Sequence, residues 1–261
     1  MPEGDTLFRT AAGLRPYLVG RDIRAARAQG PGPVPQIQRV VGKRVDSVEA
    51  HGKNLLIRFD GGLELRTHLR MHGSWHRYRP GERWRRPPGR ARLVLEVEGA
   101  IAVCFDAPVV ELFETRAEHL HPSLSRLGPD LLSPDFDAAE AHRRLRVPER
   151  TAMTISAALL DQRALAGIGN IWRNETLFAE QVDPFVPVAE VDDATLDRLV
   201  GTARRLLTES AAVAPGRVPT RVYRKSGRPC PRCGTLIRSA PLRGDVPRTT
   251  YWCPRCQGGE P

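Results

Sequence analysis

The chain has 261 residues, a mass of 29.0 kDa and 41% hydrophobic residues, which excludes a disordered or fibrous protein and predicts two or three compact units. It contains no apolar run of about 18 residues and no basic segment followed by an apolar one at its start, so we expect no membrane span and a cytoplasmic protein. The formal net charge of +10 indicates a polyanionic partner.

The positive charge is concentrated in two segments. Residues 66–92 contain nine Arg and a single acid, Glu82, and residues 217–256 contain ten Lys or Arg and a single acid, Asp245. Because these segments carry +8 and +9, the rest of the chain is net −7. This pattern favours two polyanion-binding surfaces over general basicity, although solvated surface charge is an alternative interpretation.

The first expected element is a helix. Asp5 or Thr6 can cap it, Leu7 begins its apolar face, and it ends near Gly20. Short β-type runs follow from Ile23 to about Asp106. The turns that separate them are Gly42-Lys43, His51-Gly52-Lys53-Asn54, Asp60-Gly61-Gly62 and Gly99-Ala100. This pattern predicts an antiparallel β-sandwich or barrel.

Helical patterns replace the β pattern from about Pro134. The expected helices span residues 137–146, 154–160, 170–180 and 192–213. Ala214-Pro215-Gly216 ends the last helix and leads into a cysteine-bearing tail. We therefore expect an α+β multidomain chain: an N-terminal antiparallel β-sandwich with an N-terminal helix (1–125), a helical domain (126–216) and a four-cysteine domain (217–261).

The tail carries Cys230-Pro-Arg-Cys233 and, after nineteen intervening residues, Cys253-Pro-Arg-Cys256. Four thiolates at this spacing are typical of one structural zinc ion, which has no open coordination position for catalysis. Zinc would hold a β-hairpin whose tip lies between Leu236 and Tyr251; four reduced, unliganded cysteines are the alternative. Cys104 lies in an apolar run and is expected to be a buried strand residue.

The chain start offers a nucleophile. Met1 precedes Pro2, a small residue compatible with removal of the initiator methionine, and removal leaves a secondary amine beside Glu3. An α-amino group has a lower pKa than a lysine side chain, so more of it is neutral and nucleophilic at pH 7. A secondary amine that condenses with an aldehyde carbon forms a cationic iminium, which withdraws electrons for elimination.

Four motifs in one order carry a resemblance to a known family. They are Met1-Pro2-Glu3-Gly4, the turn His51-Gly52-Lys53-Asn54, the run 159–172 (LLDQRALAGIGNIW) and the four cysteines. Together they resemble the formamidopyrimidine-DNA glycosylase and endonuclease VIII family over nearly the whole chain. Gly4 in place of leucine is similar to the endonuclease VIII branch, whose substrates are mostly oxidised pyrimidines.

The resemblance implies roles for three residues at the proposed catalytic site. Pro2 would attack C1′ of a damaged nucleotide, and Glu3 would donate a proton to the opening sugar. Lys53 would bind phosphate near the lesion and assist base removal, although a solvated turn lysine is the alternative. Base release would be followed by β- and δ-elimination of the flanking phosphates.

The resemblance also implies the DNA contacts. Gly167-Ile168-Gly169-Asn170 would join the two helices of a helix-two-turn-helix motif and bind a phosphate, with a helix N-cap as a further or alternative role for Asn170. Arg248 matches the finger arginine that grips phosphates around the everted nucleotide and would serve both catalysis and DNA binding. Met71 matches an apolar wedge that fills the vacated position in the DNA; a core-facing strand residue is its alternative.

The sequence departs from the family pattern at two places. It lacks the Asp-Pro-Arg-Arg-Phe-Gly loop of the formamidopyrimidine branch and has Phe105-Asp106-Ala107-Pro108-Val109-Val110 instead. Residue 6 is Thr where glutamate is common. Both differences bear on substrate choice, and neither removes the nucleophile.

We therefore expect a bifunctional DNA glycosylase and abasic-site lyase that excises oxidised bases. It would contain one structural Zn²⁺, bind damaged DNA as a monomer without a membrane partner, and act in the bacterial cytoplasm at the nucleoid. A non-catalytic zinc-ribbon protein that binds damaged DNA is the main alternative. An RNA-binding translation factor is a third hypothesis, which leaves Pro2-Glu3 and the glycine turn unexplained.

Overall fold

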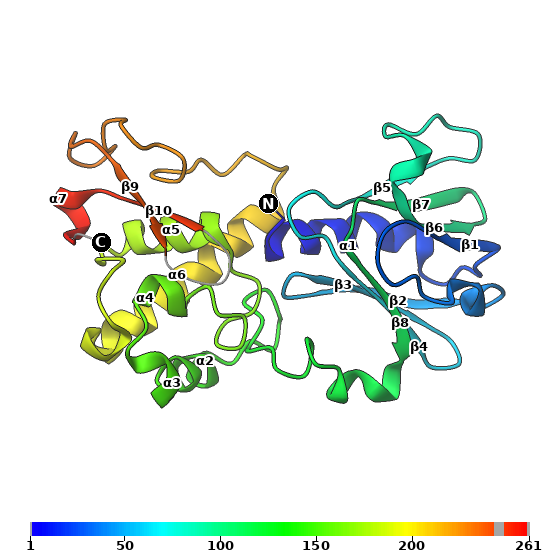
Figure 1. Cartoon of the computed structure of the whole chain (residues 1–261), viewed down its shortest axis with the longest axis horizontal. Helices are drawn as coiled ribbons and strands as arrows, with labels where there is room; N and C mark the ends of the chain where they lie inside the picture. Colours follow the sequence, from blue (N-terminus) through cyan, green and yellow to red (C-terminus); the bar gives the residue numbers. More distant parts are fainter. Residues whose placement is uncertain (1, 243–247, 260–261) are drawn as a thin grey trace. The chain divides into compact units, whose positions relative to one another are not determined.

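The computed structural model describes residues 2–242 and 248–259. The chain divides into two compact units, residues 1–126 and 127–261 (Figure 1). None of the described helices is both long and apolar enough to cross a membrane. The elements of the first unit are α1 (Gly4–Leu18), β1 (Ala25–Ala28), η1 (Ile37–Val40), β2 (Val45–His51), β3 (Asn54–Phe59), β4 (Leu63–His68), β5 (Ser74–Tyr78), η2 (Pro88–Arg90), β6 (Ala91–Val97), β7 (Ala100–Phe105), β8 (Val109–Glu114) and η3 (Thr115–Leu120).

Helix α1 begins earlier than its cap signals predict. Glu3, not Asp5 or Thr6, is the N-cap, and its carbonyl oxygen accepts hydrogen bonds from the amides of Thr6 (3.0 Å) and Leu7 (3.2 Å). The expectation of a start at Leu7 was therefore wrong by one turn. The first helical hydrogen bonds go to the backbone carbonyl of Glu3, and no side chain of the cap residue accepts one. The early start places the chain end directly on a rigid helix.

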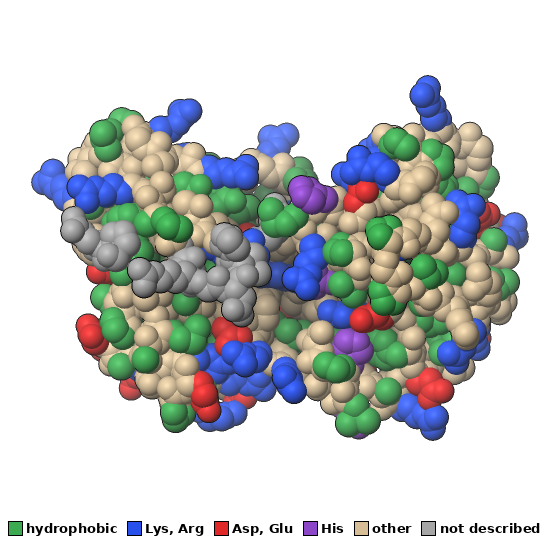
Figure 2. Space-filling model, in the orientation of Figure 1, with side chains coloured by type: hydrophobic (Ala, Val, Ile, Leu, Met, Phe, Trp, Pro, Cys, Tyr) green, Lys and Arg blue, Asp and Glu red, His purple; other side chains and the backbone are tan. Residues whose placement is uncertain are grey.

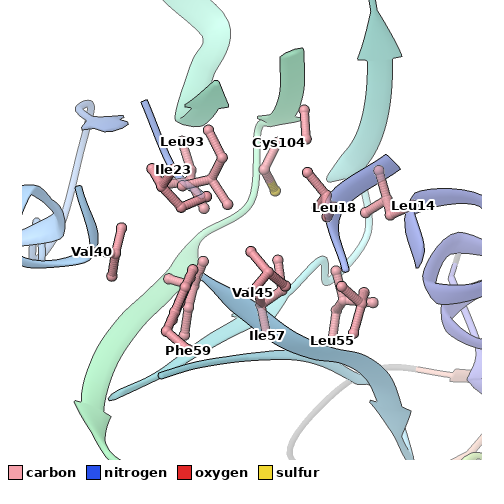
Figure 3. Close-up of a cluster of buried hydrophobic side chains, with 14 of the residues drawn as sticks. Leu14, Leu18, Ile23, Val40, Val45, Leu55, Ile57, Phe59, Leu93 and Cys104 are labelled. Atoms are coloured by element: carbon pink, nitrogen blue, oxygen red, sulfur yellow. The ribbon is translucent and has the colours of Figure 1, made fainter. Parts of the chain in front are cut away.

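The strands form the predicted antiparallel sandwich. One sheet has the strand order β2-β3-β4-β8 and the other β1-β6-β7-β5. Figure 3 shows apolar side chains of both sheets meeting in one core, with Leu14 and Leu18 of α1 in contact with it. Cys104 lies in this core with none of its surface exposed, which confirms it as a buried strand residue.

A buried carboxylate sits on the sheet that contains β3 and β4. Glu64 has no exposed side-chain surface, and its Oε2 accepts a hydrogen bond from Nε of Arg58 at 3.2 Å. Arg58 also pairs with Glu49 (2.7 Å) and Glu118 (3.0 Å), so three carboxylates share one guanidinium. Among the residues described, none offers a partner to Glu64 Oε1. Burial and the negative charge of Glu118 raise the pKa of Glu64 to about 7, against the opposing charge of Arg58.

We expect Glu64→Gln to weaken the pH dependence of stability. The folded state holds the Glu64 proton more tightly than the unfolded state, so its contribution is complete below about pH 4.5 and is lost as the pH rises through 7. Between pH 5.5 and 8 this loss is about 2 kcal/mol for wild type and absent in the variant. Urea unfolding at the two pH values measures it. Glu49→Gln is the control, because Glu49 pairs with the same arginine but is exposed. If the unfolding free energy of Glu64→Gln fell with pH as much as that of wild type, Glu64 would not be the titrating group.

The second unit is helical at first and ends in a hairpin. Its elements are α2 (Ala138–Leu145), α3 (Pro148–Thr151), α4 (Ile155–Ala158), α5 (Asn170–Ala179), η4 (Val188–Glu190), α6 (Asp193–Ala212), β9 (Arg238–Leu242), β10 (Arg248–Trp252) and α7 (Pro254–Gln257). The four predicted helices correspond to α2, α4, α5 and α6. Asp137, Thr154 and Asp192 cap three of them through side-chain oxygens.

The cysteine-bearing tail packs against α5. Phe178 of α5 shares a small apolar cluster with Val222, Ile237, Cys230 and Cys253. β9 and β10 pair antiparallel as the sequence predicts, and the predicted hairpin tip includes residues 243–247, which lie outside the described residues. Within residues 127–261 the helices and the tail therefore form one compact unit, and their division at residue 216 remains a prediction.

Candidate functional site

The amino end of α1 and the Lys53 turn lie at the same end of the first unit. The amide of Gly20, past the helix, donates to the carbonyl of Val45 at 2.8 Å, and the Arg15 guanidinium donates to the carbonyl of Val48 at 2.9 Å. The helix therefore runs antiparallel to β2, and its start lies toward the turn that follows β2. Figure 1 shows these two features at one end of the unit. Pro2 is half-buried there, and Glu3 is 1% exposed.

The Lys53 turn is held from within the sheet. Gly52 has φ +58°, which fits the first central position of a two-residue hairpin turn. Asn54 closes the turn by donating from Nδ2 to the carbonyl of His51 at 3.0 Å, and its Oδ1 accepts from Nε of Arg66 at 2.9 Å. Asn54 and Arg66 are both buried, so the backbone that carries Lys53 is rigid. The sequence analysis found the turn but missed Arg66, whose position in β4 offers no local signal.

A cluster of positive charge surrounds His68 at the end of β4. Burial, followed by the charges of Arg70, Arg66 and Lys53, lowers the pKa of His68 to about 4. The imidazole is therefore neutral at physiological pH, and its Nδ1 accepts a hydrogen bond from the amide of Arg70 at 3.2 Å. Arg66 is buried and paired with Glu111 at 2.5 Å, so the exposed Arg70 and the half-buried Lys53 supply the positive charge beside this neutral ring. Such a surface suits an anion such as phosphate. The sequence analysis did not single out His68.

Met71 lies on the loop that joins β4 to β5, at the same end of the unit. Its side chain is 52% exposed, so the alternative of a core-facing strand residue is wrong. Arg70 has φ +50°, and the amide of Gly73 donates to the carbonyl of Leu69 at 2.9 Å. A Cβ on Gly73 would lie 2.6 Å from that carbonyl oxygen, so only glycine closes this loop. The loop is therefore a tight turn that presents Met71 outward.

In the second unit the glycine turn leads directly into α5. Gly167 has φ +98°, and its amide donates to Oε1 of Gln162 at 3.1 Å. Nε2 of Gln162 in turn donates to the carbonyls of Leu160 and Ile168, so one side chain holds the whole turn. Gly169 is the N-cap of α5, and the N-cap interpretation of Asn170 is therefore wrong. The turn has the geometry for an anion at the amino end of an α-helix.

Asn170 instead links the glycine turn to strand β10. Its Nδ2 donates to the carbonyl of Thr249 at 3.2 Å, and its Oδ1 accepts from Arg173 at 2.6 Å. Arg173 is fully buried and also donates to Ser156 Oγ, Thr250 Oγ1 and the Thr249 carbonyl. Because Thr249 follows Arg248 in β10, the structure brings the glycine turn and the Arg248 strand together. The sequence did not single out Arg173, because no local pattern distinguishes a buried arginine from an exposed arginine.

A second buried polar residue of α5 holds the segment that enters the finger. Glu175 is 4% exposed, and its two carboxylate oxygens accept hydrogen bonds from three successive backbone amides. The donors are Arg221 (2.7 Å), Val222 (3.0 Å) and Tyr223 (2.9 Å). The start of the basic segment 217–256 is thereby fixed to the helix that follows the glycine turn.

The four tail cysteines meet at one point. Their sulfur atoms all lie within 4.8 Å of one another, with Cys230–Cys256 at 3.9 Å and Cys233–Cys253 at 3.4 Å. Tetrahedral zinc with Zn–S bonds of about 2.3 Å places its sulfurs about 3.8 Å apart, so the four residues fit a metal ion. Burial raises the pKa of Cys256 to about 12, and hydrogen bonds from Thr235 lower that of Cys233 to about 6.

Positive side chains are spread over both units on the face drawn in Figure 2. The sequence-predicted residues fall into two groups, one in each unit. Pro2, Glu3, Lys53 and Met71 lie at one end of the first unit. Gly167, Gly169, Asn170, Arg248 and the four cysteines lie in the second.

Comparisons with known proteins agree with this architecture. Residues 1–108 match the model of the formamidopyrimidine-DNA glycosylase N-terminal domain, and residues 127–221 match that of the formamidopyrimidine-DNA glycosylase H2TH domain. The chain is 40% identical to the probable endonuclease 8 2 of Streptomyces coelicolor, over 99% of this chain and 95% of that protein. It is 33% identical to the formamidopyrimidine-DNA glycosylase of Thermus thermophilus, over the full length of both.

Solved structures show the same fold. A crystal structure of Lactococcus lactis Fpg in complex with N7-benzyl-Fapy-dG-containing DNA superposes with a TM-score of 0.86 at 22% identity, covering 99% of this chain and 100% of that one. These similarities define the class of protein, a β-sandwich followed by a helix-two-turn-helix unit and a four-cysteine hairpin. The chain belongs to the formamidopyrimidine-DNA glycosylase and endonuclease 8 family. The predicted fold class and family are thus confirmed.

Proposed function

We propose that the protein is a DNA glycosylase and abasic-site lyase that removes oxidised bases, mostly pyrimidines, from DNA. The observation that carries the proposal is the arrangement at one end of the first unit, where the start of α1, the rigid Lys53 turn and positively charged side chains all lie. Relatives named endonuclease 8 and DNA-(apurinic or apyrimidinic site) lyase support it.

In the proposed mechanism the Pro2 nitrogen, exposed by removal of Met1, attacks C1′ of the everted nucleotide. The bond from C1′ to the base breaks, and the base leaves with the electron pair and takes up a proton. Glu3 donates a proton to the ring oxygen as the sugar opens, and the nitrogen lone pair forms a cationic iminium with C1′. Loss of a C2′ proton then expels the 3′ phosphate, and loss of a C4′ proton expels the 5′ phosphate.

The remaining residues would bind the DNA. Lys53 would hold a phosphate near the lesion, and the turn 167–170 and Arg248 would hold phosphates in the second unit. Met71 would fill the position left by the everted nucleotide. The cysteine cluster would hold one structural Zn²⁺, which keeps β9 and β10 in place and has no open position for substrate. We infer that the protein acts as a monomer at the bacterial nucleoid.

Borohydride reduction tests the proposed activity. The intact protein mixed with abasic-site DNA should leave a covalent adduct, because reduction converts the iminium into a stable amine. A gel that resolves the adduct and mass spectrometry of its amino-terminal peptide give the yield and the attachment atom. Binding of damaged DNA without any adduct would favour the non-catalytic alternative, and preference for RNA without strand cleavage would favour a translation factor.

A further inference from the structure

An arginine-rich arm, residues 79–90, connects β5 to β6. Figure 1 shows the arm as a loop that projects beyond these strands. It contains a single acid, Glu82, which accepts a hydrogen bond from the amide of Arg79 at 2.9 Å. Its five arginines are Arg79, Arg83, Arg85, Arg86 and Arg90. All of them except Arg86 are exposed.

Aromatic packing gives this arm one fixed position. Trp84 stacks on Tyr78 with ring centroids 5.9 Å apart and an interplanar angle of 24°, and its edge meets Phe105 at 5.8 Å. The backbone amide of Arg85 donates to the Tyr78 hydroxyl at 3.0 Å. The arm is therefore anchored at Trp84, and the two neighbouring arginines, Arg83 and Arg85, extend from a rigid base.

Arg86 joins the arm to two other turns. Its guanidinium donates to the carbonyl of His72 at 3.2 Å and to Oδ2 of Asp106 at 2.5 Å. Arg90 donates to the other oxygen of Asp106 at 2.8 Å. His72 follows Met71 in the β4–β5 loop, and Asp106, with φ +54°, lies in the turn between β7 and β8. The arm is thus held beside the loop that presents Met71, while Arg86 and Arg90 share the single negative charge of Asp106.

The topology places the arm and the Lys53 turn on different sheets, which the Met71 loop joins. The Lys53 turn belongs to the sheet β2-β3-β4-β8, and the arm belongs to the sheet β1-β6-β7-β5. The loop that carries Met71 crosses from the first sheet to the second. If Met71 enters the gap in the duplex and Lys53 holds the damaged strand, then the arm, which belongs to the other sheet, faces the complementary strand.

We propose that the arm binds the backbone of the DNA strand complementary to the damaged one, through Arg83 and Arg85. This inference rests on the proposed function and adds a contact to the second strand. Arginine guanidinium groups bind phosphate oxygens in a bidentate manner, and phosphate contacts fix the register of a protein on a duplex. The arm thereby makes duplex DNA a better ligand than a single strand.

Methylphosphonates, which are uncharged substitutes for phosphate groups, test the inference when they are placed in one chosen strand. Binding is measured with a duplex that contains a tetrahydrofuran abasic-site analogue, with methylphosphonates in the complementary strand around the unpaired base. These should weaken wild-type binding about tenfold, and should weaken Arg83→Ser/Arg85→Ser binding very little, because its contacts are already lost. On the unmodified duplex, the double variant should lower the slope of log Kd against log salt by about 2.

Arg39→Ser/Arg116→Ser is the matched control. Both arginines line a shallow pocket with Gly61 and Gly62 of the β3–β4 turn, at the opposite end of β3 from Lys53. This control has the same change of charge and should respond to complementary-strand methylphosphonates as wild type does. Equal weakening of wild type and Arg83→Ser/Arg85→Ser by these methylphosphonates would overturn the inference. Failure of wild type to form a borohydride adduct would instead contradict the proposed function, which is a separate measurement.

Discussion

Replacement of Pro2 by glycine is expected to slow base excision at least about 100-fold, or about 2.7 kcal/mol in the activation barrier. Glycine also permits removal of Met1, so the variant retains an α-amino group at the same place. A primary amine, however, gives a neutral imine that must gain a proton before it withdraws electrons, whereas proline gives an iminium that is always cationic. Single-turnover excision from an oligonucleotide with one oxidised pyrimidine measures the loss.

Glu3→Gln is the control for this experiment. It keeps the proline amine and removes only the carboxyl proton, so it should impair base release while the borohydride adduct on a preformed abasic site persists. Thermal unfolding of both variants separates chemistry from stability, because Glu3 is buried at the helix start. Excision by Pro2→Gly at the wild-type rate would show that another amine, such as Lys53, carries the reaction.

Cys253→Ala is expected to abolish metal binding and to unfold the finger. Three thiolates leave an open coordination position, and the tail has only a small apolar cluster to replace the energy of the metal. Arg248 lies on β10, which ends next to Cys253, so the arginine loses its support. Because small misplacements of a positioning group are costly, excision should fall about 100-fold or more. Metal content by mass spectrometry and excision rate are the measurements.

Cys104→Ala is the matched cysteine control. Cys104 lies in β7 of the first unit and is not among the clustered cysteines. Its replacement should lower the unfolding free energy by filling the core less well, and should leave the metal content unchanged. A full complement of metal in Cys253→Ala, or its loss in Cys104→Ala, would contradict the proposed zinc site.

Local sequence patterns predicted those parts of the protein that depend on interactions between residues close together in the chain. A Cys-x-x-Cys pair forms a metal-binding turn by itself, and a glycine at the first central position of a two-residue turn specifies a hairpin. The clustering of the four cysteines, the Lys53 turn and the helices α2, α4, α5 and α6 were therefore predicted correctly. The buried state of Cys104 followed in the same way from its apolar strand.

Local patterns could not predict which polar residues are buried when their hydrogen-bond partners lie far away in the sequence. Arg173 and Glu175 have the sequence character of surface residues, yet both are buried in α5 because their partners come from β10 and from residues 221–223. Arg66 is buried beside Asn54 for the same reason, across a strand pair. Burial of such groups costs free energy unless hydrogen bonds within the protein replace those lost to water, and the partners for these bonds come from segments far apart in the chain.

The sequence by itself determined the family and predicted a nucleophile at the chain start and four metal ligands, because each depends on a short run of residues. Only the tertiary structure decided that α1 runs antiparallel to β2 and brings Glu3 to the Lys53 end, and that Arg86 and Asp106 hold an arginine-rich arm beside Met71. Those arrangements depend on which strands pair and which sheet each loop leaves. Long-range pairing is a property of the whole folded chain, so no local pattern contains it.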